Sequence, residues 1–126
     1  MNPKTIYLSG PRNQIPENSY HQFAEAAEKI IALGYNVINP HVICQDIQRH
    51  LFLTDKAYQE HCMRLCIAEM SGFADTVVTL KDWEFNKEAN IEVNVARDLR
   101  FISVEHIISF LANHKNAVRA TASHKG

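Results

Sequence analysis

Three side chains at the ends of predicted elements are suited to chemistry on a small ligand. Tyr7 and Ser9 close a short β-branched and aromatic run, and Glu92 lies in the helix expected after a second, strongly apolar run. Ligands of open parallel sheets bind outside the carboxyl ends of the strands, so all three positions fall near one edge. A carboxylate there can hold a developing positive charge on a carbon atom or bond to it covalently. The pattern therefore predicts a ligand site that contains Glu92.

Alternating strands and helices must position these residues. Strands are predicted over 5–9, 35–39, 76–80 and 101–103, and helices between Ser19 and Gly34, from Asp55 to about Ser71 with Gly72 as its end, after Asn86, and over 104–114. Residues 41–54 lack a regular pattern and are expected to form a long loop over the strand ends. This order predicts an α/β fold, a flavodoxin-like three-layer sandwich with a short parallel sheet of about four or five strands in the order 2-1-3-4.

The helix after Asn86 carries the candidate carboxylate. Asn86 is suited to cap this helix, because its side chain can accept a hydrogen bond from a free backbone N–H group. We expect Ile91, Val95 and Leu99 to form its apolar stripe, with Ala89, Glu92 and Ala96 on the shoulder of that stripe. A glutamate on a helix is by default a solvated side chain, so its position alone assigns no function to Glu92.

Two patterns resemble those of the nucleoside 2-deoxyribosyltransferase-like superfamily. Residues 7–11 read Tyr-Leu-Ser-Gly-Pro, similar to the Tyr-x-Ser/Cys-Gly-Ser/Pro pattern that forms one wall of the site in that group. Residues 86–92 read Asn-Lys-Glu-Ala-Asn-Ile-Glu, similar to its Ser-x-Gly-Ala/Val-x-x-Glu pattern. The resemblance spans about residues 5–103 and is closest to small, often phage-encoded members of unknown function (DUF4406-like).

The resemblance implies an enzyme or binding protein for a deoxynucleoside or deoxynucleoside monophosphate. In the enzymes of this group, the glutamate attacks the anomeric carbon or stabilises its positive charge, and the base leaves. Transferred to this chain, Glu92 is the nucleophile, Tyr7 orients it, and Asn86 stands where relatives that take nucleotides use serine for the 5′ group. The predicted catalytic residues are thus Glu92 and Tyr7, and the predicted substrate-binding residues are Ser9, Gly10, Pro11, Arg12, Trp83 and Asn86.

The chain also departs from the family pattern at two places. Glu88 replaces a glycine one helical turn before Glu92, where it adds a like charge. The aspartate that helps to protonate the leaving base is absent, since the matching segment has Cys66 and its nearest acid is Glu69. These departures favour an alternative, a catalytically inactive protein of the same fold that binds a nucleotide or a nucleotide-derived signal. A second alternative is an adaptor that binds another protein.

The three cysteines have plain structural interpretations. Cys44, Cys62 and Cys66 are an odd number for a disulfide framework and are expected to be reduced thiols that pack in the interior. With His41 and His61 they provide four zinc ligands in principle, but the spacings match no known zinc ribbon or knuckle. We therefore expect no metal and no cofactor, and regard Cys66 as a core residue.

Composition predicts one ordinary globular domain. The 126 residues carry 13 basic and 14 acidic side chains, a formal charge of -1, which favours neither nucleic acid nor a membrane surface as a partner. No apolar run approaches the roughly 20 residues of a membrane span, so we expect a cytoplasmic protein. The domain is expected over 1–114 and a flexible tail over 115–126. A homo-oligomer is implied by the resemblance.

Overall fold

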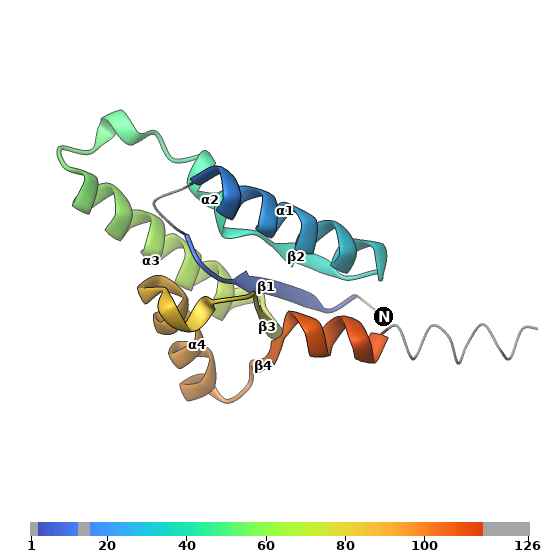
Figure 1. Cartoon of the computed structure of the whole chain (residues 1–126). Coiled ribbons are helices and arrows are strands. Elements are labelled where there is room, and N and C mark those ends of the chain that lie inside the picture. Colours follow the sequence, from blue (N-terminus) through green and yellow to red (C-terminus); the bar gives the residue numbers. More distant parts are fainter. Residues whose placement is uncertain (1–2, 13–15, 115–126) are drawn as a thin grey trace, which may run out of the picture.

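The computed structural model describes residues 3–12 and 16–114, and the predicted tail lies outside them. The elements in chain order are β1 (Thr5–Ser9), α1 (Pro16–Ala32), β2 (Asn36–Ile38), α2 (Pro40–Gln45), the 3-10 helix η1 (Arg49–Leu51), α3 (Asp55–Phe73), β3 (Thr76–Thr79), the 3-10 helix η2 (Trp83–Phe85), α4 (Lys87–Leu99) and β4 (Ser103–His106). Residues 107–114 are helical. Figure 1 shows the path of the chain through these elements.

The sheet confirms the predicted order. Its four strands run β2-β1-β3-β4, and every neighbouring pair is parallel. Tyr7 of β1 pairs with Ile38 on one side and Val77 on the other. The two central strands, β1 and β3, are the apolar runs of the sequence, as expected for strands covered on both faces.

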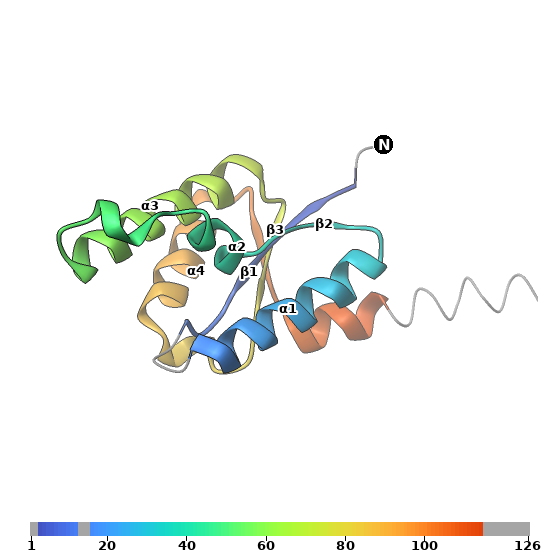
Figure 2. The ribbon, with the colours of Figure 1, turned by 90° about the horizontal axis from the view of Figure 1, so that it is seen from above.

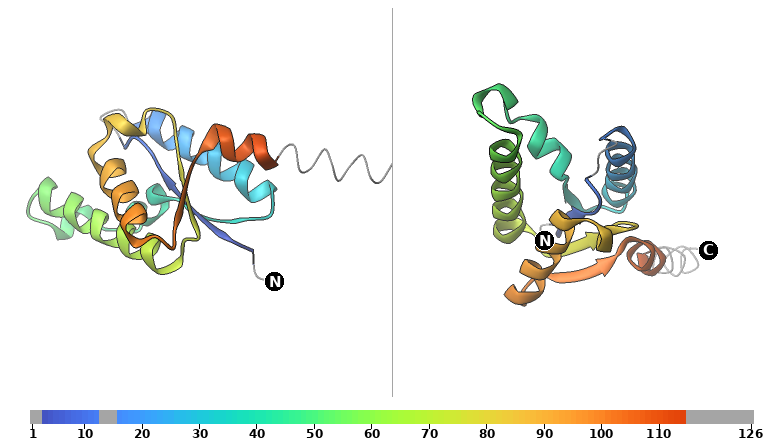
Figure 3. Two further views of the ribbon diagram at one scale, coloured as in Figure 1. Left: turned by 90° about the horizontal axis from the view of Figure 1, so that it is seen from below. Right: turned by 60° about the vertical axis from the view of Figure 1, so that its left-hand side comes forward.

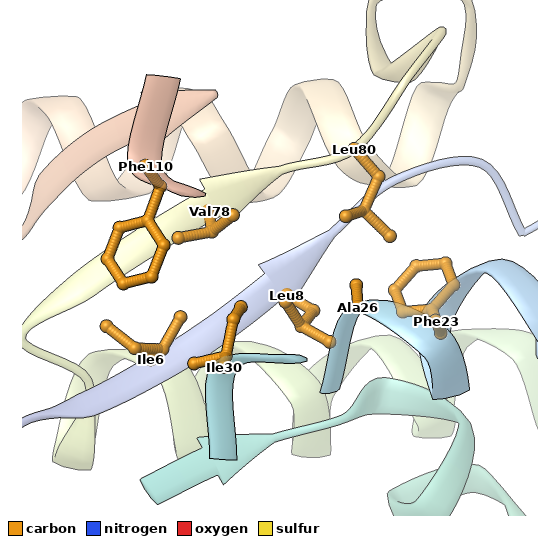
Figure 4. Packing of buried hydrophobic residues seen from close by; sticks show 8 residues of the cluster. All are labelled: Ile6, Leu8, Phe23, Ala26, Ile30, Val78, Leu80 and Phe110. Carbon is orange, nitrogen blue, oxygen red and sulfur yellow. The ribbon is translucent and has the colours of Figure 1, made fainter. Parts of the chain in front are cut away.

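Helices cover both faces of the sheet, which makes the fold a three-layer α/β sandwich. Figures 2 and 3 show α1 and the helix at 107–114 on one face, with α3 and α4 on the other. The first face is held by a core cluster drawn in Figure 4, in which α1 and the last helix pack on β1 and β3. The cluster consists of Ile6, Leu8, Phe23, Ala26, Ile30, Val78, Leu80 and Phe110.

The alternation of side chains along β1 divides this strand between the two faces. Ile6 and Leu8 belong to the first cluster, whereas Tyr7 belongs to a second cluster with side chains of α3 and α4. Successive side chains of a strand point to opposite faces, so Ser9 shares the face of Tyr7. β1 therefore contributes to the core on one side and presents two hydroxyl groups to α4 on the other.

The connection between β2 and α3 differs from the predicted loop. Residues 41–54 contain most of α2 and the whole of η1. Pro40 begins α2 instead of only ending the preceding strand, because proline suits the first turn of a helix and Asn39 caps it through a hydrogen bond from the His41 N–H group. The prediction of an irregular loop was wrong because a six-residue helix is too short to produce an apolar period.

Several helix boundaries also differ from the predictions. Gly34 ends α1 with a φ of 98°, as predicted, but Ser19 lies inside α1. Thr54 caps α3 through a hydrogen bond from the Ala57 N–H group, so Asp55 is its first residue. α3 continues through Gly72, around which no atom lies close enough to require glycine. The last strand is Ser103–His106, later than predicted, so the last helix begins at 107.

The buried face of α4 is not the predicted stripe. Ile91 and Leu99 are exposed, and the buried residues are Ala89, Glu92, Val93 and Ala96. The small alanine side chains let α4 approach the sheet closely, which turns the helix so that Glu92 faces β1. The predicted stripe consisted of the larger apolar side chains of the helix. The residues that pack inward include two alanines, because small side chains fit a close contact between helix and sheet.

Among the described residues, no helix is both long enough and apolar enough to cross a membrane. The longest of these helices, α3, has 19 residues and carries several charged side chains.

Gly10 is required by the contact between the end of β1 and β3. A Cβ atom at this position would lie 2.8 Å from the Cβ of Leu80, which cannot move without its backbone. We expect Gly10→Ala to lower the free energy of unfolding in urea by about 1–3 kcal/mol, as overpacked core substitutions do. Gly72→Ala is the matched control. Its free energy of unfolding should not fall, since the surroundings of Gly72 are open. Equal stability of Gly10→Ala and the native protein would contradict this contact.

Candidate functional site

A buried carboxylate lies at the carboxyl edge of the sheet. Glu92 has no exposed surface, although an isolated charge costs several kcal/mol to bury. Its Oε1 accepts a hydrogen bond of 2.9 Å from the Ser9 hydroxyl and forms an ion pair with Arg12. Its Oε2 accepts a hydrogen bond from the Tyr7 hydroxyl. The sequence analysis predicted that Tyr7 orients Glu92, whereas Ser9 and Arg12 were predicted to bind substrate, and the structure brings all three onto one carboxylate.

Two separate segments deliver these groups. Tyr7 and Ser9 lie on the same face of β1, and Arg12 follows directly after the strand. The carboxylate arrives from α4, whose start is fixed by Asn86, because its side chain accepts a 3.0 Å hydrogen bond from the Ala89 N–H group. Figure 1 shows the carboxyl end of β1 and the first turns of α1 and α4 at one edge of the sheet. Glu92 lies little more than one turn into α4 and so faces β1.

Arg12 is the counter-ion of Glu92 and is itself largely buried. Its side chain is 14% exposed, and one guanidinium nitrogen also lies 3.4 Å from the Tyr7 hydroxyl. Burial is the largest single effect and would lower the pKa of Arg12, but the Glu92 charge, Tyr7 and the hydrogen bond to Glu92 together raise the pKa above its usual value. The guanidinium therefore remains charged, and its Nε is a buried donor that none of the described residues satisfies.

Tyr7 acts only as a hydrogen-bond donor to the carboxylate. Burial, followed by the neighbouring Glu92 charge, raises the pKa of Tyr7 well above its usual value. The phenol therefore keeps its proton throughout the ordinary pH range. A rigid donor of this kind orients the carboxylate and leaves its other oxygen to Ser9 and Arg12.

Ser19 and His41 brace the segment that carries Arg12. The Ser19 hydroxyl donates its single proton to the Pro11 carbonyl, so the His41 Nε2, 2.9 Å away, donates to Ser19. Burial, and then the charge of Arg12, lowers the pKa of His41 below 6.5, so the ring is neutral at pH 7. The sequence did not indicate that Ser19 and His41 belong to the site. Their contact joins α1 to α2, and α2 was predicted to be part of a loop.

Two hollows lie beside the segments that flank the carboxylate, and Glu92 itself lines neither of them. One has a volume of about 210 Å³ and is lined by Arg12, His41, Cys44, Tyr58, Gln59, Cys62, Met63 and Glu88. The other has about 340 Å³ and is lined by Pro11, Asp82, Phe85 and Asn86. Both border the segment that follows β1 and the start of α4. We refer to them below as the Arg12 cavity and the Asn86 cavity.

The thiols lie at the side of the Arg12 cavity. Cys44 and Cys62 line it, and Cys66 is completely buried beside Tyr7 in the second core cluster, as expected for a core residue. Contact with the Cys66 thiol, together with burial, raises the pKa of Cys44, and the same contact lowers the pKa of Cys66. In the described part of the chain, no group of three or more His, Cys, Asp and Glu residues is arranged to hold a metal ion.

The other predicted substrate-binding residues divide into two groups. Pro11 and Asn86 line the Asn86 cavity. Gly10 is buried and serves the close contact with Leu80. Trp83 lines neither cavity; it packs against the second core cluster, with the Arg97 guanidinium 5.8 Å from the centre of its ring. Trp83 therefore packs against the core, and the structure does not place it in either cavity.

The chain belongs to a protein family that is described as a domain of unknown function (DUF4406), and the family model matches residues 4–105. No curated protein and no solved structure matches the chain. The matched residues contain every side chain that contacts Glu92, so the site is part of the family domain. These comparisons do not connect the chain to the nucleoside deoxyribosyltransferases.

Removal of the charge on Glu92 should destabilise the fold strongly. Glu92→Gln leaves the Arg12 guanidinium buried without its counter-ion, so we expect the free energy of unfolding to fall by about 3–5 kcal/mol. The matched control is Glu84→Gln, an exposed glutamate on η2, which should change it by less than about 0.5 kcal/mol. Urea unfolding followed by circular dichroism measures both. A loss in Glu92→Gln no larger than in the control would contradict the buried ion pair.

Proposed function

Because the family has no assigned function, we propose from the site that the protein acts on the N-glycosidic bond of a deoxynucleoside or deoxynucleoside monophosphate, with Glu92 as the nucleophile. The bond is broken by transfer of the sugar to water or to a second base. A homo-oligomer is part of the same proposal.

The observation that carries this proposal is a fully buried Glu92 carboxylate held by three donors, one of which, Arg12, also lines a cavity. Tyr7 and Ser9 hold the carboxylate rigidly, and fixed orientation is what a nucleophile needs to reach a reacting carbon. The anomeric carbon gains positive charge as the base leaves, and a nearby anion stabilises that charge or bonds to it. The position of Glu92 also agrees with that of the glutamate in the resembling enzymes.

Arg12 must leave the carboxylate before the carbon can approach. In the ligand-free protein, Arg12 both pairs with Glu92 and lines the cavity that bears its name. An acceptor on the ligand, such as a sugar hydroxyl or a phosphate oxygen, can take up the unpartnered Nε and draw the guanidinium away. Arg12 then changes from counter-ion to ligand-binding group, and Glu92 becomes free to react.

The two cavities suit the two ends of a nucleoside. The Arg12 cavity is smaller than typical drug-sized sites, of about 300–1,000 Å³, and fits a group the size of a base. The Asn86 cavity can take the 5′ end of the sugar beside the first turn of α4. Asp82 lines this second cavity, and its charge favours a 5′ hydroxyl over a 5′ phosphate.

A second candidate is a binding protein of the same fold without catalysis. Two observations favour it: the ion pair with Arg12 occupies Glu92, and the buried thiol of Cys66 stands where the resembling enzymes have an acid. Such a protein would be stabilised by a nucleoside or nucleotide without releasing its base.

The test is a release assay on the purified protein with a panel of deoxynucleosides and their 5′ monophosphates. We expect free base from at least one member, detected by chromatography, and a drop in the rate of 100-fold or more in Glu92→Gln. Glu84→Gln is the matched control and should retain the native rate, while light scattering on the same samples measures the oligomeric state. Circular dichroism verifies that each variant is folded.

Two results would overturn the enzymatic proposal. One is the absence of base release from the native protein across the whole panel, in which case thermal stabilisation by a panel member would support the binding protein. The other is release that persists at the native rate in folded Glu92→Gln, because the carboxylate would then not be the nucleophile.

A further inference from the structure

The proposed reaction needs a proton donor, and Cys66 cannot provide it. A neutral base departs as a poor leaving group unless it receives a proton, so a general acid must face it. The position that holds this acid in the resembling enzymes is occupied by Cys66, whose side chain is completely buried under the second core cluster. The thiol has no access to either cavity, so a different residue must supply the proton.

The Arg12 cavity offers few proton donors apart from one carboxyl group. His41 is neutral at pH 7 and uses its Nε2 proton for Ser19. The Tyr58 hydroxyl donates to the Cys44 carbonyl at 3.3 Å, and burial raises the pKa of Tyr58. Burial and neighbouring thiols likewise raise the pKa of Cys44. Glu88 is the single carboxyl group in the lining of this cavity.

The position of Glu88 relative to Glu92 suits a pair of catalytic carboxyl groups. Glu88 lies in the first turn of α4 and Glu92 four residues later, so their Cβ atoms are about 5–6 Å apart on one helix face. Side chains at this spacing can bring their two carboxyl groups within the separation of about 5–5.5 Å that retaining glycosidases use. Glu88 is half-buried and takes part in no ion pair among the described residues, whereas Glu92 is fully buried and paired with Arg12.

From this arrangement we infer that Glu88 is the general acid and base of the site, the partner of the Glu92 nucleophile. This inference rests on the proposed function. A Glu92 oxygen bonds to C1′ as the bond from C1′ to the base nitrogen breaks, and the bonding electron pair stays with the base. The Glu88 carboxyl group gives its proton to the base, which departs neutral, and Glu88 becomes a carboxylate.

The same residue completes the cycle. Water, or a second base, approaches C1′ from the side that the first base has left. The Glu88 carboxylate takes the proton of the incoming group, the new bond to C1′ forms, and the ester bond to Glu92 breaks. Glu88 is thereby protonated again and Glu92 is again a carboxylate, so that the enzyme returns to its starting state.

The experiment compares two substrates that differ in their need for a proton. The first is a neutral deoxynucleoside that the native protein cleaves, and the second is the 2-deoxyriboside of a pyridinium base such as nicotinamide, which departs neutral without protonation. We expect Glu88→Gln to lower kcat/KM, which reports the step that releases the base, by about 100-fold or more for the neutral substrate and by less than about threefold for the pyridinium substrate. Glu92→Gln should lose both activities, and Glu84→Gln should lose neither.

Each contrary result has a distinct meaning. An equal loss on both substrates in Glu88→Gln would overturn the role of Glu88 as proton donor while leaving the Glu92 chemistry intact. The same is true if His41→Gln, and not Glu88→Gln, shows the loss confined to the neutral substrate. If the native protein releases base from neither substrate, the proposed function fails, and the inference fails with it.

Discussion

The ion pair between Arg12 and Glu92 is the constraint on which the rest of the site depends. A charged carboxylate without exposed surface is tolerated only if it is paired and hydrogen-bonded, and here Tyr7, Ser9 and Arg12 meet that requirement together. Replacing the pair with apolar side chains would build an equally stable core, so stability alone does not account for it. The proposed function supplies a further reason for the pair, because it makes Glu92 the nucleophile and Arg12 the counter-ion that neutralises it.

One strand supplies both the core and the site. Alternate residues of β1 pack under α1 and the last helix, while Tyr7 and Ser9 face α4. Because the hydroxyl donors belong to a central strand with neighbours on both sides, their positions are as fixed as the sheet itself. Only Arg12, which follows the strand, has a side chain that can change partners without disturbing the core. The proposed function uses this division, because the rigid strand orients the carboxylate while Arg12 is proposed to exchange partners when a ligand binds.

Much of this could be predicted from the sequence, because it depends on local patterns. The strand order, the cap at Asn86 and the grouping of Tyr7, Ser9 and Arg12 with Glu92 follow from short motifs and parallel-sheet topology. The buried face of α4 could not be predicted, since small alanines pack inward there. Glu88 was interpreted as an unfavourable like charge, because the sequence does not reveal that Arg12 pairs with Glu92 and lines the same cavity as Glu88. The buried face of α4 and the surroundings of Glu88 both depend on contacts between elements that are distant in the sequence.

The central claim is that Glu92 forms a covalent bond to the sugar. A 2-deoxy-2-fluoro nucleoside tests it most directly, because the fluorine withdraws electrons from C1′ and slows the second step so that the ester accumulates. The account predicts that intact-protein mass spectrometry detects an increase equal to one fluorinated sugar, mapped to the peptide that contains Glu92. Release of base without an adduct, or an adduct on another residue, would contradict it.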